Sequence, residues 1–234
     1  MTSIYCDGEY LMNNKNWHAE DSTWKAHHIS QIIDRNNISF HTVMEVGCGA
    51  GAILNALSFR YGDEKCSFDG YDISPQAIAM AKKNDSPRVR YFLEDPLSEK
   101  HDKHYDILLM IDVFEHVRDY MGFIGSCKAK ANYKIFHIPL ELNASSVLRN
   151  TFLNSRRSVG HLHYFTAESA LATLEETGHE IIDYNFTSGA IDLYRQHPSL
   201  KTAIANIPRW LVSKFSVPLS ARLFGGFSLL VLTK

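Results

Sequence analysis

Cysteine is scarce in this 234-residue sequence: only Cys6, Cys48, Cys66 and Cys127 occur, and no two of them form a CxxC pair. Such wide spacing argues against a disulfide framework or a zinc site and indicates reduced thiols. The sequence also lacks any apolar run of the roughly 18 residues that span a bilayer. Its first residues lack the basic start and apolar core of a signal peptide. We therefore expect a cytoplasmic protein without stable membrane insertion.

A strong excess of charge of either sign is missing as well. Lysine and arginine number 24, aspartate and glutamate number 26, and the formal net charge is −2. This balance gives no electrostatic reason to expect nucleic acid as the main partner. Repeats and low-complexity tracts are also missing. The length and the 45% content of hydrophobic residues fit one α/β domain with additions, or two small domains.

The most informative stretch is residues 43–54, which reads VMEVGCGAGAIL. Its first apolar residues predict a short buried strand, its three alternating glycines predict a tight turn, and its last residues predict the start of a helix. Glycine permits positive φ and the close approach of a ligand, and the amides at a helix start favour negative charge. We therefore expect a ligand-binding turn at this point.

Apolar periodicity and turn residues predict the other elements. Helices are expected over residues 23–34 with Ser22 as cap, over 52–61, after the Ser74-Pro75 pair, and from Thr166 to Gly178. Strands are expected at 42–46, 67–71, 88–93, 105–111, 133–138, 180–186 and 227–232. This alternation predicts a parallel sheet covered on both faces, and the late strands allow an antiparallel edge. Residues 139–164 are expected to form a loop with one short helix, and residues 195–222 show only scattered apolar positions and prolines.

The spacing of the glycines separates classes of nucleotide site. A P-loop requires a lysine on the phosphates, and no lysine follows Gly47 at the required position. The spacing Gly47-x-Gly49-x-Gly51, with Glu45 before it, instead resembles the first motif of class I S-adenosylmethionine (SAM) methyltransferases.

The resemblance continues at the ends of the later strands, the edge at which open α/β sheets bind ligands. Asp72 ends the second predicted strand, Asp95 follows the third, and the run IDVFEH follows the fourth at residues 111–116. The run GHLHYFT at residues 160–166 is similar to quinone-biosynthesis O-methyltransferases. The resemblance covers residues 40–234 and implies an α/β, Rossmann-like sheet of seven mostly parallel strands, with helices on both faces and an antiparallel last strand.

This resemblance also implies a domain organisation and a cofactor site. Residues 1–40 are expected to form an arm and a helix that cap the site, and residues 41–234 a methyltransferase domain with insertions at about 139–165 and 195–222. Asp72 is expected to bind ribose hydroxyls and Asp95 the adenine amine, with a helix-start acid and a turn acid as the alternatives. The residues expected to bind SAM are Glu45, Gly47, Cys48, Gly49, Gly51, Asp72, Ile73, Asp95, Pro96, Ile111 and Asp112.

The candidate catalytic residues are His116, Glu115, His161 and His163. As a general base, His116 would take a proton from the nucleophile as the methyl group moves, and the alternative is a hydrogen bond to the backbone at a helix start. Two histidines two residues apart can bind a metal, but no third ligand is adjacent in sequence, so no metal is expected. The candidate substrate-binding residues are Trp17, His18, His137, Tyr164 and Arg149, with a solvated side chain as the alternative for the arginine.

The resemblance implies a class of reaction. Residues 112–115 lack the Asn/Asp-Pro-Pro-aromatic turn of amine methyltransferases that act on nucleobases, and residues 137–140 lack the Asp-Asn pair of metal-dependent catechol enzymes. We therefore expect metal-independent methyl transfer from SAM to a small-molecule acceptor, at oxygen rather than nitrogen, by a monomer or homodimer. Two alternatives stay open: a methyltransferase that acts on RNA or protein, and a SAM-binding protein that transfers no methyl group.

Residues 195–222 are expected to cover the sheet, with membrane contact or dimerisation through Trp210 and Phe215 as alternatives.

Overall fold

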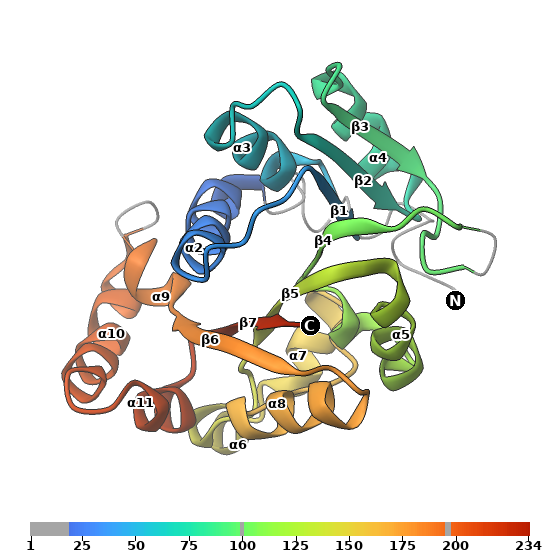
Figure 1. The fold of residues 1–234 in the computed structure, drawn as a ribbon. Coiled ribbons are helices and arrows are strands. Elements are labelled where there is room, and N and C mark those ends of the chain that lie inside the picture. The colour runs from blue at the N-terminus through green and yellow to red at the C-terminus, as the bar shows by residue number, and fades with distance from the viewer. Residues whose placement is uncertain (1–18, 99–100, 195–197) are drawn as a thin grey trace.

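The structure is a computed structural model, and it describes residues 19–98, 101–194 and 198–234 (Figure 1). The strands within these residues are β1 (Thr42–Val46), β2 (Ser67–Asp72), β3 (Val89–Leu93), β4 (Tyr105–Ile111), β5 (Ala131–Pro139), β6 (Ile181–Thr187) and β7 (Ser228–Thr233). The α-helices are α2 (Ser22–Arg35), α3 (Ala52–Arg60), α4 (Pro75–Ala81), α5 (Tyr120–Ser126), α6 (Ala144–Arg149), α7 (Phe152–Ser158), α8 (Ala167–Glu176), α9 (Gly189–Asp192), α10 (Leu200–Ser213) and α11 (Val217–Phe224).

The strands of the described residues form one sheet in the order β3-β2-β1-β4-β5-β7-β6. Strand β7 runs antiparallel to both β5 and β6, and the other neighbouring strands are parallel. This topology confirms the predicted Rossmann-like, mostly parallel sheet with an antiparallel last strand. The order of the strands reverses between β1 and β4, and such a reversal leaves a crevice at the carboxyl ends of the two strands.

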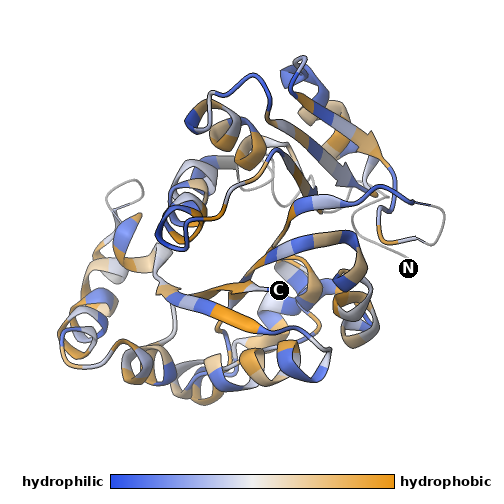
Figure 2. Cartoon of the chain, viewed as in Figure 1, coloured by the Kyte–Doolittle hydropathy of each residue, from blue (hydrophilic) through white to orange (hydrophobic). Residues whose placement is uncertain are grey.

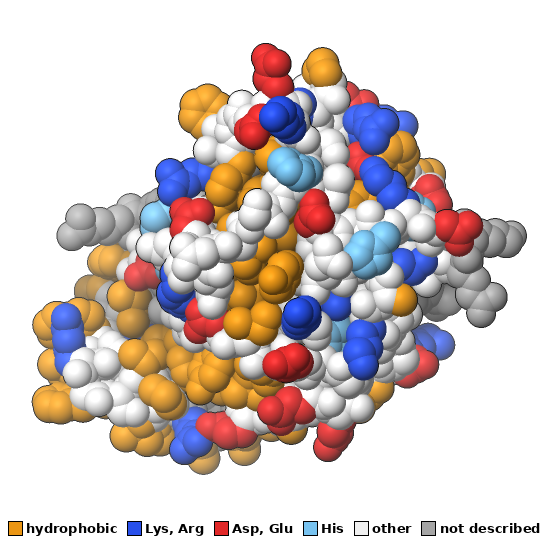
Figure 3. Space-filling model, in the orientation of Figure 1, with side chains coloured by type: hydrophobic (Ala, Val, Ile, Leu, Met, Phe, Trp, Pro, Cys, Tyr) orange, Lys and Arg blue, Asp and Glu red, His pale blue; other side chains and the backbone are white. Residues whose placement is uncertain are grey.

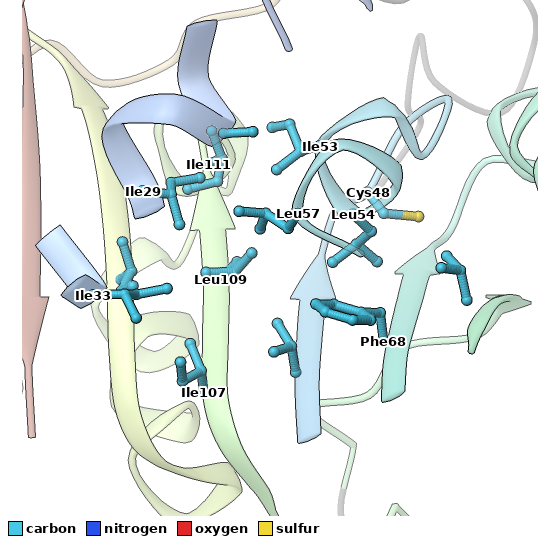
Figure 4. Packing of buried hydrophobic residues seen from close by; sticks show 14 of the residues in the cluster. Ile29, Ile33, Cys48, Ile53, Leu54, Leu57, Phe68, Ile107, Leu109 and Ile111 are labelled. Carbon is cyan, nitrogen blue, oxygen red and sulfur yellow. The ribbon is translucent and has the colours of Figure 1, made fainter. Parts of the chain in front are cut away.

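Helices cover both faces of the sheet because the central strand β4 is apolar on both of its faces. Ile107 and Leu109 belong to the core shared with α2 and α3, whereas Leu108 and Met110 belong to the core shared with α5 and α8. All four side chains are fully buried. Figure 4 shows Leu109 in the first core together with Leu57 of α3. This packing fixes the carboxyl ends of β1 and β4, and with them the side chains that follow.

Hydrogen bonds confirm two of the predicted helix starts. The Ser74 hydroxyl accepts a bond from the Ala77 amide at the start of α4, and a proline follows in the first turn. Thr166 and Ser169 exchange bonds between side chain and backbone at the start of α8, which forms a capping box.

The prediction that Ser22 caps the first long helix is wrong. Helix α2 begins at Ser22 itself, and Asp21 occupies the cap position. The Asp21 carboxylate makes no cap bond and instead pairs with Lys25 Nζ at 3.0 Å. This ion pair lies at the edge of the crevice and matters for the site described below.

Two segments contain more helix than the sequence predicts. Residues 139–164 hold two short helices, α6 and α7, and residues 195–222 hold α10 and α11. Pro208 lies inside α10, and another proline lies in the first turn of α11. Many large apolar side chains of α10 and α11 also face solvent, so the sequence showed no stripe of residues directed toward the core. Helix α5 was not predicted either. Among the described residues, none of the helices combines the length and the apolar character needed to cross a membrane.

Replacing Leu109 by alanine should lower the free energy of unfolding by about 2–5 kcal/mol, because the fully buried side chain would leave a cavity in the sheet core. Leu148→Ala on α6 is the matched control. Its side chain is 86% exposed, so the loss should stay within about 0.5 kcal/mol. Urea denaturation measures both values, and equal losses would contradict the described core.

Candidate functional site

A cavity of about 570 Å³ opens at the edge of the sheet where the carboxyl ends of β1 and β4 meet. Its walls come from the start of α2, the turn after β1, the ends of β2 and β4, and the segments that follow β3 and β5. The residues that the sequence analysis assigned to SAM binding line this cavity with one exception. Gly51 does not line it, but Ala50 and Ala52 on either side of Gly51 do.

The turn after β1 depends on its glycines. The φ angles are +72° at Gly47, +53° at Gly49 and +77° at Gly51, in the region that favours glycine. A Cβ atom on Gly47 would lie 2.7 Å from the Val113 side chain, and one on Gly51 would lie 2.4 Å from the Tyr91 ring. A larger residue at Gly47 would therefore displace Val113 in the cavity wall, and one at Gly51 would displace the buried Tyr91 ring.

Asp72, at the end of β2, reaches across to this turn. Its Oδ2 accepts a hydrogen bond from the Gly49 amide at 2.9 Å, and its Oδ1 accepts one from the Ser74 amide at 2.8 Å. Burial raises the pKa of Asp72, although these backbone bonds oppose the effect. A carboxylate oxygen can accept more than one bond, so Asp72 can hold the turn and still accept bonds from hydroxyl groups in the cavity.

Glu45 lies on β1 beside the cavity and is 2% exposed. Its Oε2 atom is buried and has no hydrogen-bond partner within the described residues. Burial raises the pKa of Glu45 well above its usual range, against the opposing charge of Lys25. A buried carboxyl group without a partner is costly, so a cationic group bound in the cavity would be stabilised next to it. The ammonium group of an amino acid fits this requirement.

Asp112 follows β4 with a φ of +55°, which is uncommon for a residue other than glycine. Its Oδ2 lies 2.9 Å from Lys25 Nζ of α2, and its Oδ1 lies 2.6 Å from His137 Nδ1 of β5. Burial would raise the pKa of Asp112, but the charges of His137 and Lys25 outweigh burial and lower it. Asp112 lines the cavity, and its carboxylate joins α2 to β5.

Glu115, His116 and His161 come together where the short 3-10 turn after β4 (Phe114–His116) meets the segment before α8. The Oε1 atom of Glu115 lies 3.9 Å from His116 Nε2 and 4.0 Å from His161 Nε2. His161 Nδ1 is hydrogen-bonded to Glu141 Oε2 at 2.8 Å, and the His116 ring is hydrogen-bonded to the Gly160 backbone. The Glu141 bond thus holds the His161 ring through Nδ1, with Nε2 toward Glu115, and the three side chains line the cavity.

Burial controls the charges in this cluster. Glu115 is fully buried, neither of its carboxylate oxygens has a hydrogen-bond partner in the described part of the chain, and burial raises its pKa to about 8. Burial lowers the pKa of His116 to about 4. Burial opposes the charge of His161 as well, but the hydrogen bond with Glu141 and the nearby acidic groups together outweigh burial and raise the pKa of His161. At neutral pH the cluster therefore contains a neutral His116 beside a largely protonated Glu115.

The same cluster has the donor set of a metal site. Glu115, His116 and His161 each offer one ligand atom, and these atoms lie within 4.8 Å of one another, so modest side-chain shifts would bring them onto one ion. A histidine that binds a metal is commonly oriented by a carboxylate hydrogen-bonded to its other ring nitrogen. Glu141 makes such a bond with Nδ1 of His161. The sequence could not show this set because its members lie 45 residues apart in the chain.

The structure places other candidate residues outside the main cavity. His163 is not among its lining residues, and its Nε2 donates to the Val117 carbonyl at 2.9 Å. Tyr164 donates its hydroxyl to the Phe152 carbonyl at 2.8 Å, and Arg149 lines a smaller, adjoining cavity of about 360 Å³. Trp17 and His18 lie outside the described residues. The predicted roles of these residues stay predictions.

The remaining candidates line the main cavity. His137 is 4% exposed, and its Nε2 is 3.0 Å from the Thr187 hydroxyl oxygen, so the ring is held on both sides. Asp95 is exposed and its Oδ1 accepts a bond from the Leu97 amide, which is the turn role weighed as its alternative. Both residues nevertheless face the cavity, as does the 44% exposed side chain of Ile73.

Two residues of the site were missed from the sequence. Lys25 carries no sequence signal, because one lysine on an amphipathic helix is usually a solvated residue. Glu141 closely follows the carboxyl end of β5, as Asp72 and Asp95 mark the ends of β2 and β3. Its place at a strand end could therefore have identified it. Ser155 of α7 donates to Glu141 Oε1 at 2.9 Å and helps to orient it.

Comparison with known sequences identifies similar proteins. A family model described as a methyltransferase domain matches residues 18–184. A ubiquinone biosynthesis O-methyltransferase of Nitrosomonas europaea is 28% identical over 131 residues, covering 53% of this chain and 53% of that protein. A malonyl-acyl-carrier-protein O-methyltransferase of Ilyobacter polytropus is 26% identical over 137 residues, covering 58% of this chain and 44% of that protein. The chain spans about half the length of these curated relatives.

Solved structures share the fold at low sequence identity. The magnesium protoporphyrin IX methyltransferase of Synechocystis PCC 6803, solved with bound SAH, has a TM-score of 0.58 at 14% identity, covering 91% of this chain and 82% of that chain. The cyclase SpnF has a TM-score of 0.59 at 17% identity, covering 89% of this chain and 81% of that chain. These likenesses concern the fold alone, and the second shows that proteins of this fold include a cyclase.

Replacing Glu115 by glutamine should stabilise the protein most at alkaline pH. The pKa of Glu115 is about 8 in the folded protein and ordinarily 4.5, so the folded state holds a proton that the unfolded chain loses between these values. Stability therefore falls as pH rises through this window, by up to roughly 5 kcal/mol, and glutamine removes this loss. Thermal unfolding of chelator-treated protein at pH 5 and pH 9 measures the effect.

The exposed residue Glu176 provides the control, since Glu176→Gln should change the melting temperature equally at both pH values. A stabilisation by Glu115→Gln that is the same at pH 5 and pH 9 would contradict the raised pKa.

Proposed function

The chain belongs to the methyltransferase domain family, and on this premise we propose that it transfers a methyl group from SAM to an oxygen atom of a small-molecule acceptor. Membership of the family confirms the predicted class, a SAM-dependent methyltransferase domain. One observation supports the proposal most strongly. The glycine turn with Asp72 and the Glu115–His116–His161 cluster line the same cavity. One end of the cavity thus suits the cofactor and the other suits proton transfer.

The residues around the turn fit SAM. The buried and unpartnered Glu45 Oε2 would accept the ammonium of its methionine part, and Asp72 would accept ribose hydroxyl groups. The exposed apolar side chain of Ile73 offers a surface for the adenine ring, with Asp95 beside it for the amine. When bound, SAM supplies an electrophilic methyl group on its sulfonium sulfur.

His116 is the proposed general base. Its low pKa keeps the ring neutral at pH 7, so it is available to accept the proton that a hydroxyl loses as its oxygen bonds to the methyl carbon. Glu115 Oε1 lies 3.9 Å from His116 Nε2, so the carboxyl group would favour the imidazolium electrostatically as it forms. Positioning the acceptor in line with the methyl group and excluding water supplies the rest of the rate enhancement.

Two features support oxygen and a small acceptor. The names of both curated relatives describe O-methyltransferases, and the segment after β4 lacks the turn of nucleobase-amine enzymes. This chain also shares its fold with a cyclase. A second candidate function is therefore a SAM-binding protein that transfers no methyl group. RNA and protein acceptors are less favoured, because the chain has no net positive charge.

Calorimetry with SAM, followed by mass spectrometry after incubation with cell extract, tests the proposal. We expect saturable binding, formation of S-adenosylhomocysteine, and a product heavier by one CH₂ unit. Binding without formation of S-adenosylhomocysteine would favour the second candidate, and no binding would refute the function.

The same reaction is repeated with EDTA to test for a metal. A rate that EDTA abolishes and Zn²⁺ or Mn²⁺ restores would make the Glu115–His116–His161 cluster a metal site rather than a base.

Substitutions at the two ends of the cavity should have opposite effects. His116→Gln should lower kcat by about 10²–10⁴-fold and leave the Kd for SAM within about threefold, because the base acts only on the acceptor. Asp72→Ala should raise that Kd at least about tenfold, since it removes the hydroxyl acceptor and frees the Gly49 amide. Calorimetry and product formation separate the two effects.

His104→Gln is the matched control, because His104 is exposed and lies outside the main cavity, so this variant should keep both constants. If His116→Gln weakened SAM binding as strongly as Asp72→Ala, the assignment of His116 as base would be refuted.

A further inference from the structure

Helix α10 presents its apolar side to solvent and its polar side to the protein. Large side chains recur along one face at positions 200, 204, 207 and 211, the spacing of a helical stripe. Their exposed fractions are 78% for Leu200, 60% for Ile204, 58% for Ile207 and 49% for Leu211. A helix of a water-soluble domain normally turns such a stripe toward the core, so another surface is expected to cover this one.

Two polar side chains of α10, Asn206 and Arg209, face inward. Asn206 donates to the Ala190 carbonyl, and Arg209 donates to the carbonyls of Gly225 and Phe224. In the described part of the chain, α10 has no buried side chain, so polar contacts rather than a hydrophobic core attach it to the domain. The outward direction of the stripe is therefore fixed by the fold.

The exposed apolar surface continues beyond α10. Trp210 is 50% exposed and Phe215, in the link to α11, is 92% exposed. On α11, Leu219 and Leu223 are 46% and 37% exposed, one turn apart. Figure 3 shows hydrophobic side chains gathered over the two helices, and Figure 2 shows hydrophobic and hydrophilic residues along both of them. We call this surface, from Leu200 to Leu223, the hairpin face. Patches of this kind mark interaction sites.

Charge identifies the partner. All 26 acidic residues of the chain precede position 193, and the sequence from there to the C-terminus carries only basic charge, at Arg195, Lys201, Arg209, Lys214, Arg222 and Lys234. At the hairpin face, Lys214 Nζ lies 5.0 Å from the centre of the Trp210 ring. A tryptophan with an adjacent lysine on an amphipathic helix is suited to the interface between lipid headgroups and acyl chains. Arg209 faces inward and Arg222 pairs with Glu168, so within the described residues Lys214 is the cation that we place at this face.

We propose that the hairpin face docks the protein on the surface of an anionic lipid bilayer. The apolar side chains of α10 and α11 enter the acyl boundary while the helices lie in the membrane plane, and Lys214 contacts acidic headgroups. The inner side of the hairpin lines the smaller cavity, which shares Pro139, Glu141, Gly189 and Ser228 with the main cavity. Docking therefore brings the site close to the bilayer, but it does not require the proposed methyl transfer.

Vesicle flotation tests the proposal with the full chain. We expect binding to vesicles of phosphatidylcholine with phosphatidylglycerol, weaker binding to phosphatidylcholine alone, and a decrease at high salt. The triple variant Ile207→Ser, Trp210→Ser, Phe215→Ser should lose at least about tenfold in partitioning, because it removes much of the apolar area. These side chains are exposed, so circular dichroism and the melting temperature should not change.

Phe59→Ser is the matched control, since Phe59 is 91% exposed but lies on α3, and its variant should float like the parent protein. No binding of the parent to either vesicle, or equal binding of the triple variant, would overturn the proposal. Sedimentation analysis adds a further outcome. A parent dimer that the triple variant converts to monomers would show that a second copy covers the face instead.

Discussion

The carboxylate of Asp112 is the interaction on which the arrangement of the site depends. It follows the central strand β4 in a strained backbone conformation, and it contacts Lys25 of α2 and His137 of β5. Left-handed backbone at a residue other than glycine costs about 1–3 kcal/mol and persists only where its surroundings enforce it. Here the contacts of Asp112 with Lys25 and His137 enforce it. The chain then turns sharply, so that Glu115 and His116 enter the cavity beside the glycine turn instead of continuing along the sheet.

The two ends of the cavity differ in electrostatic character. Around the glycine turn, Asp72 accepts a bond from a backbone amide, and Glu45 Oε2 is buried without a partner among the described residues. These acids are suited to the hydroxyl and cationic groups of a cofactor. Around His116, burial suppresses charge on the histidine and on Glu115, while Glu141 favours charge on His161. Active sites that transfer protons commonly contain neighbouring titratable groups whose surroundings shift their pKa values in opposite directions. The residues proposed for cofactor binding thus follow β1 and β2, and those proposed for proton transfer follow β4 and line the same cavity.

Much of this arrangement could be predicted because it is local in sequence. Gly47, Asp72 and Glu115 follow or end predictable strands, and parallel strands bring their carboxyl ends to one edge. The contacts of Lys25 with Asp112 and of Glu141 with His161 could not be predicted, because nothing in a single sequence specifies which side chains meet across the fold. Helices α10 and α11 were missed for another reason. Their apolar residues face solvent and their prolines lie within or at the start of a helix, so the rules for core-facing helices did not apply.

We propose that one cavity orients SAM with its reactive sulfur toward the Glu115–His116–His161 cluster. A crystal structure with S-adenosylhomocysteine is the decisive measurement. We expect the ribose at Asp72, the amino group near Glu45 and the thioether sulfur facing His116. A ligand bound with its sulfur turned away from the cluster, or bound outside the cavity, would refute this orientation.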